Sequence, residues 1–477
     1  MPGRAKLYPS IRTAVPDLHG ISSCCVHAKP VPLPDQKFPL NRTSANLSAA
    51  LSQLSTGLVN MKILVYSHDW APAVGGTQTA MTSLASGLAS ELRSRGNSAG
   101  LTFVTSTPAG EMDDRTMPFS VVRTPGFTEL IRLIRASEVV HLAGPALLPL
   151  FLSWLLRKKI VIQHHNYQAV CPNGLLLQSP ERSMCSNHFL NGRTRECVRC
   201  HATNVGWRRS IWHAALAYPR LWLSRRAAAN VTVSNHAAKR LSLPALRTIY
   251  NGTRAHTRAA SHHDRSSSLS PCVAYVGRLT PDKGVAVLIS AAIELAEQGC
   301  EFGLRIIGDG PERASLEGLV RFLELRHLIT FTGFLEGDDL ARATSDAIAI
   351  VMPSLSEETA GLAAIEQMMH GKLVIASDIG GLSEVLGSTG LKCAPGNSHE
   401  LAQCIRRALE DPEMRVRLGA AARERALAMF TEKRMVSEHL KLYEEVLGIP
   451  KRRKWSAKLI RRRLLTSRHM RQVKSRR

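Results

Sequence analysis

The sequence predicts an α/β protein with two Rossmann-like, doubly wound domains that face each other across a cleft. Short apolar runs alternate with helical patterns over residues 61–252, and a polar segment with few apolar residues follows at 253–270. The same alternation starts again at Pro271 and continues to residue 448. Parallel strands covered by helices on both faces produce this alternation. Because ligands in such sheets bind at the carboxyl ends of the strands, the space between the two units is the expected site.

The strands are predicted from continuous apolar runs bounded by turn residues. The first unit begins with a run from Met61 to Ser67, and the turn at Gly75-Gly76 leads into a helix from about Thr79 to Arg95. Its further strands are predicted at Leu101–Thr105, Glu138–Leu142, Lys159–Gln163, Asn230–Ser234 and Arg247–Tyr250. Those of the second unit are predicted at Cys272–Val276, Gly303–Ile307, Leu328–Phe331, Ala347–Val351 and Leu373–Ala376. A packed final helix is expected at Glu432–Leu447.

Both ends of the chain differ from this pattern. Residues 1–60 are rich in proline, serine and polar residues, which predicts a disordered extension, and Met61 is an alternative start. Residues 449–477 form a basic tail with thirteen Lys or Arg and no acid from Lys451 onward. The two ends account for most of the net charge of +24 and leave +7 for the middle of the chain. We therefore expect the tail to contact an anionic membrane surface, and we expect no specific nucleic-acid partner.

The composition favours a cytoplasmic protein. No run reaches the roughly 18–20 apolar residues of a membrane span, and the longest candidate, Gly144–Leu156, contains two prolines. The first sixty residues lack the apolar core of a signal peptide. Ten cysteines in 477 residues are ordinary for a chain whose thiols stay reduced. The expected location is the cytoplasm, with the tail allowing peripheral contact with the inner face of the membrane.

The segment from Met352 to Glu366 contains the first group of candidate site residues. A strand is predicted to end at Pro353, a loop to present Glu358, and a helix to begin near Gly361. Free amides at a helix start bind anions, and a glycine lets a phosphate approach the backbone closely. Glu366 is then placed to accept hydrogen bonds from ribose hydroxyls, and Glu358 to face a sugar. Two glutamates beside a surface helix start would also fit a purely structural role.

A second group lies between Tyr275 and Gly284, where a strand ends and a helix begins. This run contains Gly277, Arg278 and Lys283. An arginine can bind phosphate oxygens bidentately and a lysine adds a point charge, while the glycines keep the backbone out of the way. These residues are therefore candidates for phosphate binding, and helix capping with solvated charge is the alternative.

Together these motifs resemble glycosyltransferase family 4, the retaining enzymes of the GT-B fold that are also called glycosyl transferases group 1. In chain order the motifs are Gly75-Gly76, Ser234-Asn235-His236, Asn251-Gly252, Gly277-Arg278, Lys283-Gly284, Gly308-Asp309-Gly310-Pro311, Phe331-Thr332-Gly333 and the Glu358/Glu366 pair. The resemblance covers roughly Met61 to Gly448. It implies two facing Rossmann-like domains with the nucleotide-sugar donor bound by the second one.

The resemblance also implies a role for each candidate residue. Arg278 and Lys283 would hold the donor diphosphate, Glu366 the ribose, and Glu358 the transferred sugar. Further donor-binding positions are implied at Gly75, Gly76, Thr77, Gly277, Gly361 and Leu362. Two cations and a helix start stabilise a leaving diphosphate without a metal ion, so no cofactor is expected for catalysis. Closure of one domain on the other would exclude water.

Two departures from the family pattern concern the same site. The family usually places Gly-Phe-Gly after the first glutamate, whereas Thr359 and Ala360 stand here before Gly361. The first-domain glycines are followed by Thr77-Gln78. The first departure leaves the donor sugar open, and neither departure removes a charge assigned to phosphate.

A histidine pair follows a predicted strand of the first unit. His164 and His165 come at the carboxyl end of the strand that begins at Lys159, where a side chain can point into the cleft. The family commonly has a histidine near the transferred sugar, and we assign this catalytic position to His165, with His164 as the second choice. A histidine that only bonds neighbouring backbone is the alternative.

Residues 171–201 form a cysteine-rich insertion in the first unit. Cys171, Cys185, Cys197 and Cys200 have spacings that could close a tetrahedral structural zinc site, and free thiols are the alternative.

A helical pattern follows the insertion. Trp207, Ile211, Tyr218 and Trp222 recur at helical spacing beside several arginines. This pattern indicates either an interfacial membrane helix or packing on the first sheet.

The sequence thus predicts a hexosyl-type glycosyltransferase that uses a UDP or GDP sugar and a glycan or lipid-linked acceptor. By resemblance, the expected process is bacterial cell-surface polysaccharide or lipopolysaccharide biosynthesis. The alternatives are a catalytically inactive scaffold that binds membrane or nucleic acid through its tail, and another GT-B enzyme such as a sugar-nucleotide epimerase. Fold similarity alone does not decide among these activities.

Overall fold

The computed structural model describes residues 61–72, 75–97, 100–110, 112–179, 183–254 and 271–449. The predicted disorder of residues 1–60, most of the predicted linker and the basic tail from residue 450 lie outside the described residues.

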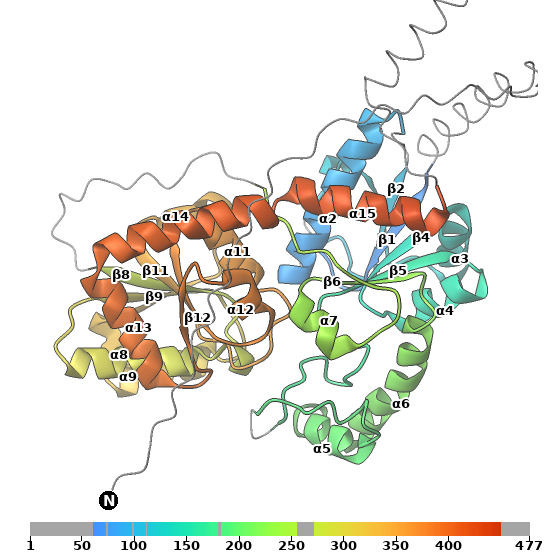
Figure 1. The fold of residues 1–477 in the computed structure, drawn as a ribbon. Helices are drawn as coiled ribbons and strands as arrows, with labels where there is room; N and C mark the ends of the chain where they lie inside the picture. The colour runs from blue at the N-terminus through green and yellow to red at the C-terminus, as the bar shows by residue number, and fades with distance from the viewer. Residues whose placement is uncertain are drawn as a thin grey trace, which may run out of the picture. The chain divides into compact units, whose positions relative to one another are not determined.

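The first lobe is built on a parallel sheet with the strand order β3-β2-β1-β4-β5-β6-β7 (Figure 1). Its strands are β1 Ile63–Ser67, β2 Leu101–Thr105, β3 Ser120–Arg123, β4 Val139–Ala143, β5 Lys159–His164, β6 Ala229–Thr232 and β7 Leu246–Thr248. Its helices are α2 Gly76–Ser94, α3 Phe127–Ala136, α4 Leu147–Leu155, α5 Thr194–Val205, α6 Trp207–Ser224 and α7 Asn235–Leu241. The order reverses between β1 and β4, which is the switch point of a doubly wound sheet.

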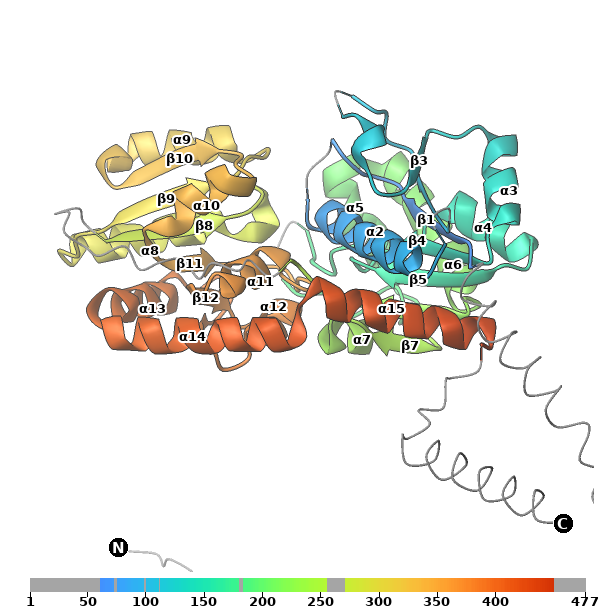
Figure 2. The same cartoon turned by 90° about the horizontal axis from the view of Figure 1, so that it is seen from above.

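The second lobe has the same architecture, with the strand order β10-β9-β8-β11-β12-β13 (Figure 2). Its strands are β8 Cys272–Val276, β9 Gly303–Ile307, β10 Ile329–Gly333, β11 Ala347–Met352, β12 Leu373–Ser377 and β13 Leu391–Cys393. Its helices are α8 Val285–Glu297, α9 Arg313–Phe322, α10 Gly337–Ser345, α11 Leu362–Met369, α12 Gly380–Leu386, α13 Ser398–Glu410 and α14 Pro412–Met429. Two parallel sheets with helices on both faces confirm the predicted fold class.

Burial on both faces explains why the strands read as continuous apolar runs. In β1, Ile63 and Val65 belong to one buried cluster, whereas Leu64 and Tyr66 belong to another on the opposite face. Successive strand side chains point to opposite faces, so a strand between two helical layers needs apolar residues at every position. The sequence analysis found no strand at β3 or β13. Both are short edge strands, and the β3 residues are all partly or fully exposed.

The last helix, α15 Glu432–Leu447, crosses back to the first lobe. The sequence-based division placed residues 271–448 in one domain, but the buried face of α15, including Met435, Leu440 and Tyr443, packs in the first-lobe core. The Tyr443 hydroxyl lies 2.8 Å from Nδ1 of His141 on β4. Figure 1 shows α14 running along the second lobe and α15 continuing along the first. Helical periodicity reveals that a helix has a buried face, but it does not reveal which sheet that face covers.

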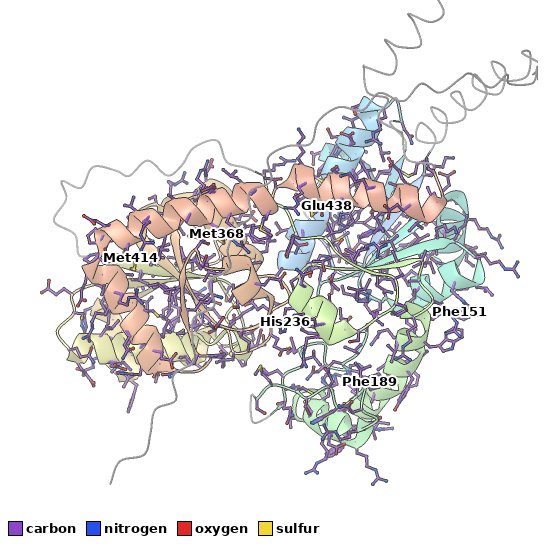
Figure 3. All side chains as sticks on the ribbon, in the orientation of Figure 1. Phe151, Phe189, His236, Met368, Met414 and Glu438 are labelled. Carbon is purple, nitrogen blue, oxygen red and sulfur yellow. The ribbon has the colours of Figure 1, made fainter. Side chains whose placement is uncertain are left out.

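The two lobes contact each other where α7 approaches α12. Glu384 on α12 accepts hydrogen bonds from the backbone N–H groups of Asn235 at 2.9 Å and His236 at 2.7 Å, both at the start of α7. Arg240, also on α7, donates from Nε to Glu357 of the second lobe at 2.7 Å. His236 is labelled at this junction in Figure 3. These charge-assisted contacts connect the first lobe to the loop that carries Glu358.

Among the described residues, no helix combines the length and the hydrophobicity that crossing a bilayer requires.

Candidate functional site

A cavity of about 880 Å³ lies between the lobes and is lined by loops from the carboxyl ends of strands in both sheets. All eleven residues assigned to donor binding or catalysis lie in its wall: Gly75, Gly76, Thr77, His165, Gly277, Arg278, Lys283, Glu358, Gly361, Leu362 and Glu366. The position follows from topology, because the ends of parallel strands meet at one edge of each sheet. The volume is in the usual range for a small-molecule site.

Two helix starts converge on this cavity. A Cβ atom placed on Gly76, at the start of α2, would lie 3.8 Å from the Cβ atom of Leu362, at the start of α11. Neither helix has an acidic residue in its first turn or a side-chain cap at its amino end. The partial positive charges and free amides of both helices are therefore available to an anion from opposite sides.

Glycines let the surrounding loops approach one another. Gly361 has φ +72° as the residue that starts α11, and an added Cβ would lie 2.7 Å from Cδ1 of Leu382. Gly284 has φ +69°, and an added Cβ there would lie 2.0 Å from the carbonyl oxygen of Pro353. A larger residue at Gly284 would push the Arg278–Lys283 loop away from the loop that carries Glu358, and one at Gly361 would push the start of α11 away from α12.

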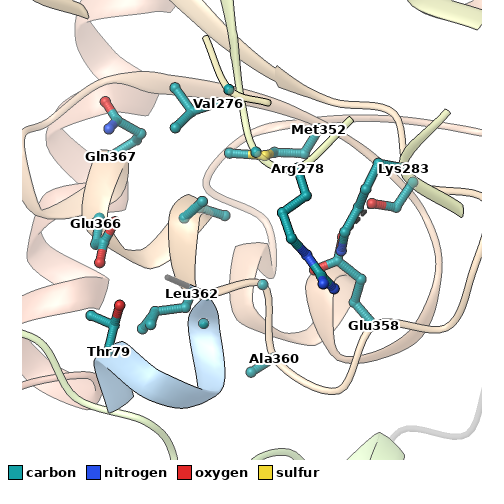
Figure 4. A pocket seen from close by; sticks show the side chains of 18 of the residues that line it. Thr79, Val276, Arg278, Lys283, Met352, Glu358, Ala360, Leu362, Glu366 and Gln367 are labelled. Atoms are coloured by element: carbon teal, nitrogen blue, oxygen red, sulfur yellow. Dashed lines mark hydrogen bonds and ion pairs between the residues drawn. The ribbon is translucent and has the colours of Figure 1, made fainter. Parts of the chain in front are cut away.

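The two predicted phosphate-binding cations differ in their surroundings. The Nζ atom of Lys283 lies 2.7 Å from Oε1 of Glu358, and the same oxygen accepts a hydrogen bond from the Ser354 hydroxyl. Arg278 is exposed at the cavity, and no described residue forms an ion pair with its guanidinium group. Figure 4 shows Arg278, Lys283 and Glu358 on one side of the cavity, with Glu366 on the other. The cavity thus offers one unpaired cation and one ion pair that an anion could open.

Glu366 is a half-buried residue on α11. Burial raises its pKa to about 7. No side chain or backbone group among the described residues forms a hydrogen bond with this carboxyl, although it lines the cavity together with Thr79 of α2. A carboxylate in such a position becomes favourable when a ligand supplies hydroxyl donors.

The structure distinguishes between the two histidines at the end of β5. His164 is fully buried, and its Nε2 lies 2.9 Å from Oδ1 of Asn230. His165 lines the cavity, and its Nε2 has no hydrogen-bond partner among the described residues. Burial, followed by the nearby His164 and His439 rings, lowers the pKa of His165 to about 3. His165 is therefore a neutral imidazole near pH 7, with ring atoms free to bond a ligand.

The residues that interrupt the family pattern form a link between the lobes. Thr359 follows Glu358, and its hydroxyl donates a hydrogen bond of 2.8 Å to the backbone carbonyl of His165. Ala360 is buried beside it. Thr359 thus attaches the second-lobe loop that carries Glu358 to the end of β5 in the first lobe.

Several lining residues were not assigned from the sequence. They include Thr79 on α2, Ser354 beside Glu358, and the loop Phe334–Gly337 after β10. The loop could have been expected, since it follows a strand end at the same sheet edge as Arg278. Ser354 has no comparable signal in the sequence, because its role comes from a side-chain contact.

The four cysteines of the insertion lie apart from this cavity. Burial raises the pKa of the Cys197 thiol to about 12, and the neighbouring Cys171, Cys185 and Cys200 thiols add to the increase. Within the residues that the structure describes, no group of three or more His, Cys, Asp or Glu side chains is arranged to hold a metal ion. The four thiols thus lie near one another, but in this structure they are not arranged to coordinate a metal ion. Zinc binding stays a prediction.

Part of the chain is similar in sequence to sugar-transferring enzymes. Residues 263–425 match the family model described as Glycosyl transferases group 1. A 2-deoxystreptamine glucosyltransferase of Streptomyces kanamyceticus is 36% identical over 180 residues, which are 37% of this chain and 46% of that protein. The lipopolysaccharide core biosynthesis glycosyltransferase LpsD of Rhizobium meliloti is 35% identical over 210 residues, covering 43% of this chain and 58% of that one. The match to the first of these relatives spans about half of its length.

The fold extends over more of the chain than these sequence matches. The structure of HepE from Anabaena in complex with UDP and glucose matches this chain with a TM-score of 0.58 at 19% identity. The matched region is 80% of this chain and 99% of the HepE chain. At this identity the likeness shows the fold alone. Residues 263–425 therefore form a glycosyl transferases group 1 domain, in a protein with the two-lobed GT-B fold.

Proposed function

We propose that the protein is a retaining, hexosyl-type glycosyltransferase that moves a sugar from a UDP or GDP sugar to an acceptor. The observation that carries the proposal is the convergence of an unpaired arginine and two uncapped helix starts on the cavity that also contains Glu358 and Glu366. Such an arrangement matches a nucleoside diphosphate, whose two phosphates are anionic and whose ribose offers hydroxyl donors.

These residues bind successive parts of the donor, from the diphosphate to the ribose. The diphosphate binds Arg278 and the amides of Gly361 and Leu362, and it draws Lys283 away from Glu358. The ribose hydroxyls donate to the otherwise unpartnered Glu366, which stabilises the charged form of that carboxyl. Gly76 and Thr77 approach the phosphates from the first lobe.

The sugar then lies between Glu358 of the second lobe and His165 of the first. During transfer, the bond between the anomeric carbon and the diphosphate oxygen breaks, and the acceptor oxygen bonds to the same face of that carbon. The acceptor proton passes to an oxygen of the leaving phosphate. Arg278, Lys283 and the helix starts stabilise the negative charge that develops on the leaving group, so the proposal requires no metal ion or other cofactor.

The acceptor is proposed to be a glycan or a lipid-linked glycan of a bacterial cell surface, reached from the cytoplasmic face of the membrane. Support comes from the relative LpsD, which is named for lipopolysaccharide core biosynthesis. The basic tail, which lies outside the described residues, is proposed to add contact with anionic lipid.

The two alternatives are less well supported by the site. An inactive scaffold would have no need for an unpaired Arg278 and an unpartnered Glu366 in one cavity. An epimerase would act on the nucleotide sugar alone, and the Glu358/Glu366 arrangement is the pattern of the transferases that the chain resembles.

The test is a thermal-shift and calorimetric screen of UDP, GDP, ADP and their common sugar conjugates. It uses the wild-type chain and an Arg278→Ala/Lys283→Ala variant. We expect selective binding of one nucleotide by the wild type and its loss in the variant. Absence of binding to every nucleotide would overturn the proposal in favour of the scaffold.

A further inference from the structure

Large apolar side chains are exposed along two neighbouring helices of the first lobe. On α4 they are Leu148, Phe151, Trp154 and Leu155, and on α6 they are Trp207, Ile211, Trp212, Tyr218 and Trp222. We call these nine residues the α4–α6 surface. Trp207 and Trp212 are 60% and 62% exposed, which is far more than a side chain packed on a sheet would be. Figure 3 labels Phe151 at the outer side of the first lobe.

Helix α6 buries small side chains and exposes its tryptophans, whereas an ordinary amphipathic helix buries its largest apolar side chains. The helix buries small residues such as Ala214 and Ala217, whereas its tryptophans face outward. A helix that served only to cover the sheet would bury its largest apolar residues. The sequence analysis left two interpretations of this helix, packing on the first sheet and contact with a membrane interface. Packing on the sheet explains why the small residues are buried, but it does not explain why the aromatic residues are exposed.

Aromatic residues of α4 and of the carboxyl-terminal end of α6 lie beside one another. The rings of Trp154 and Trp222 meet edge to face with centroids 5.1 Å apart, and Phe151 lies 6.1 Å from Trp154. Arg226 stacks over Trp222 at 3.6 Å. Four of the six tryptophans in the sequence belong to this surface. Tryptophan is enriched where proteins meet the headgroup region of a membrane, because its ring is apolar and its N–H is polar.

The charged residues of α4 and α6, and those that directly follow the two helices, are all basic. Exposed basic residues follow or flank the two helices at Arg157, Lys159, Arg208, Arg209, Arg225 and Arg226. The sequences of α4 and α6 contain no aspartate or glutamate. A second copy of the chain docking on this surface would bring like charges together, which is unfavourable. An anionic partner satisfies both the arginines and the aromatic rings.

We propose that the α4–α6 surface binds an anionic lipid bilayer, with its tryptophans in the headgroup region and its arginines on lipid phosphates. This inference does not depend on the proposed reaction. It also differs from contact through the basic tail, because it assigns lipid binding to the folded first lobe, the lobe that presents His165 to the cavity.

The experiment measures binding of the full chain to vesicles of phosphatidylcholine alone and of phosphatidylcholine with phosphatidylglycerol. A Trp455→Phe background removes the tail tryptophan, so quenching of tryptophan fluorescence by brominated lipid reports on the folded part of the chain. We expect quenching only with the anionic vesicles. Arg225→Glu/Arg226→Glu should weaken binding by more than about tenfold, and Trp207→Ser/Trp212→Ser should reduce the quenching.

Three controls make the result specific. Phe322→Ser removes a residue that is 83% exposed on α9 of the second lobe, and it should leave vesicle binding unchanged. Arg461→Glu/Arg462→Glu/Arg463→Glu reverses charges in the tail. Thermal unfolding and nucleotide binding of each variant show whether the fold and the donor site are intact.

Several outcomes would overturn the proposal. Vesicle binding that survives both surface variants but is lost in the tail variant would assign lipid contact to the tail. Self-association without lipid that the surface variants abolish would identify a second copy as the partner, and tight binding of duplex DNA that they abolish would identify nucleic acid. Absence of vesicle binding by the wild-type chain, with its nucleotide binding retained, would reject this inference and leave the proposed reaction standing.

Discussion

The hydroxyl of Thr359 donates a hydrogen bond of 2.8 Å to the backbone carbonyl of His165, which is 194 positions away in the chain. This contact connects the loop that carries Glu358 with the end of β5. Thr359 is also one of the two residues that interrupt the glycine-rich pattern of the family that the chain resembles. We infer that Thr359 is a positioning residue that holds the side chains of Glu358 and His165 at a fixed separation.

Replacement of Thr359 by valine should reduce turnover without weakening nucleotide binding. Valine keeps the branched shape and removes the donor, and a net hydrogen bond corresponds to about a threefold to tenfold effect. The decrease should appear in kcat, whereas the calorimetric affinity for the free nucleotide should match that of the wild type. Thr359→Ser keeps the hydroxyl and should restore most of the activity. A Thr359→Val enzyme with wild-type kcat and a weaker nucleotide affinity would contradict the positioning role.

Replacement of Glu366 by glutamine should stabilise the ligand-free protein at alkaline pH while weakening donor binding. An unfolded glutamate has a pKa of about 4.3, whereas burial raises the pKa of Glu366 to about 7 in the folded chain. Between pH values of about 4.3 and 7, the folded chain keeps a proton on Glu366 that the unfolded chain has lost. The free energy of unfolding therefore falls as the pH rises through this range. Above pH 7 the buried carboxylate costs the folded state on the order of 3 kcal/mol.

Urea unfolding at pH 5 and pH 8 tests this expectation for Glu366. At pH 5 the glutamine variant and the wild type should be similar in stability, because glutamine resembles the protonated acid. At pH 8 the variant should be the more stable protein. The affinity of the wild type for its nucleotide should rise between pH 6 and pH 8, since ribose donors favour the carboxylate, and the variant should lack that component. Equal stability differences at both pH values would show that the carboxyl is not buried in solution.

Replacement of Arg278 and of Lys283 should differ in its effect on stability, although both residues are proposed to bind phosphate. Loss of a charged hydrogen-bonding partner should lower nucleotide affinity by about tenfold to hundredfold in either alanine variant. Arg278→Ala should leave the unfolding temperature unchanged, because its guanidinium has no ion-pair partner among the described residues. Lys283→Ala should lower it, since Glu358 then loses the ammonium group at 2.7 Å. Arg321→Ala on α9 is an exposed control that should affect neither quantity.

Zinc binding by Cys171, Cys185, Cys197 and Cys200 is tested by metal analysis after gentle purification. The prediction from the spacing is about one equivalent of zinc per chain, lost in a Cys197→Ser/Cys200→Ser variant. Well under one equivalent would remove the zinc hypothesis. Free thiols would then remain, and the raised pKa of Cys197 predicts slow alkylation at neutral pH.

The strands that the sequence predicted well are the ones buried on both faces. β2, β8 and β9 were located at their observed bounds, because each is a predominantly apolar run whose residues are buried or half-buried. β3 and β13 were missed since an edge strand is short and partly exposed. Pattern analysis therefore works where the environment of a strand is uniform, and it weakens at the sheet edges.

The site was predictable to the extent that topology determines it. Arg278 and Glu366 could be placed in one cavity because loops at the carboxyl ends of parallel strands gather at one edge of the sheet. The contact of Thr359 with His165 could not be predicted, since it depends on how the two lobes meet. The exposure of the tryptophans on α6 could not be predicted either, because helical spacing does not show whether an apolar face is buried or exposed.

The return of α15 to the first lobe means that the chain connects the lobes twice. The two connections lie side by side, since the backbone N–H of Thr253 donates to the carbonyl of Phe430 at 2.9 Å and that of Glu432 to the carbonyl of Thr253 at 3.0 Å. A protease that cut once between residues 254 and 271 would therefore produce two fragments that remain associated. The carboxyl-terminal fragment would stay bound to the first lobe through Met435 and Tyr443, and the two fragments of the nicked protein would still unfold together.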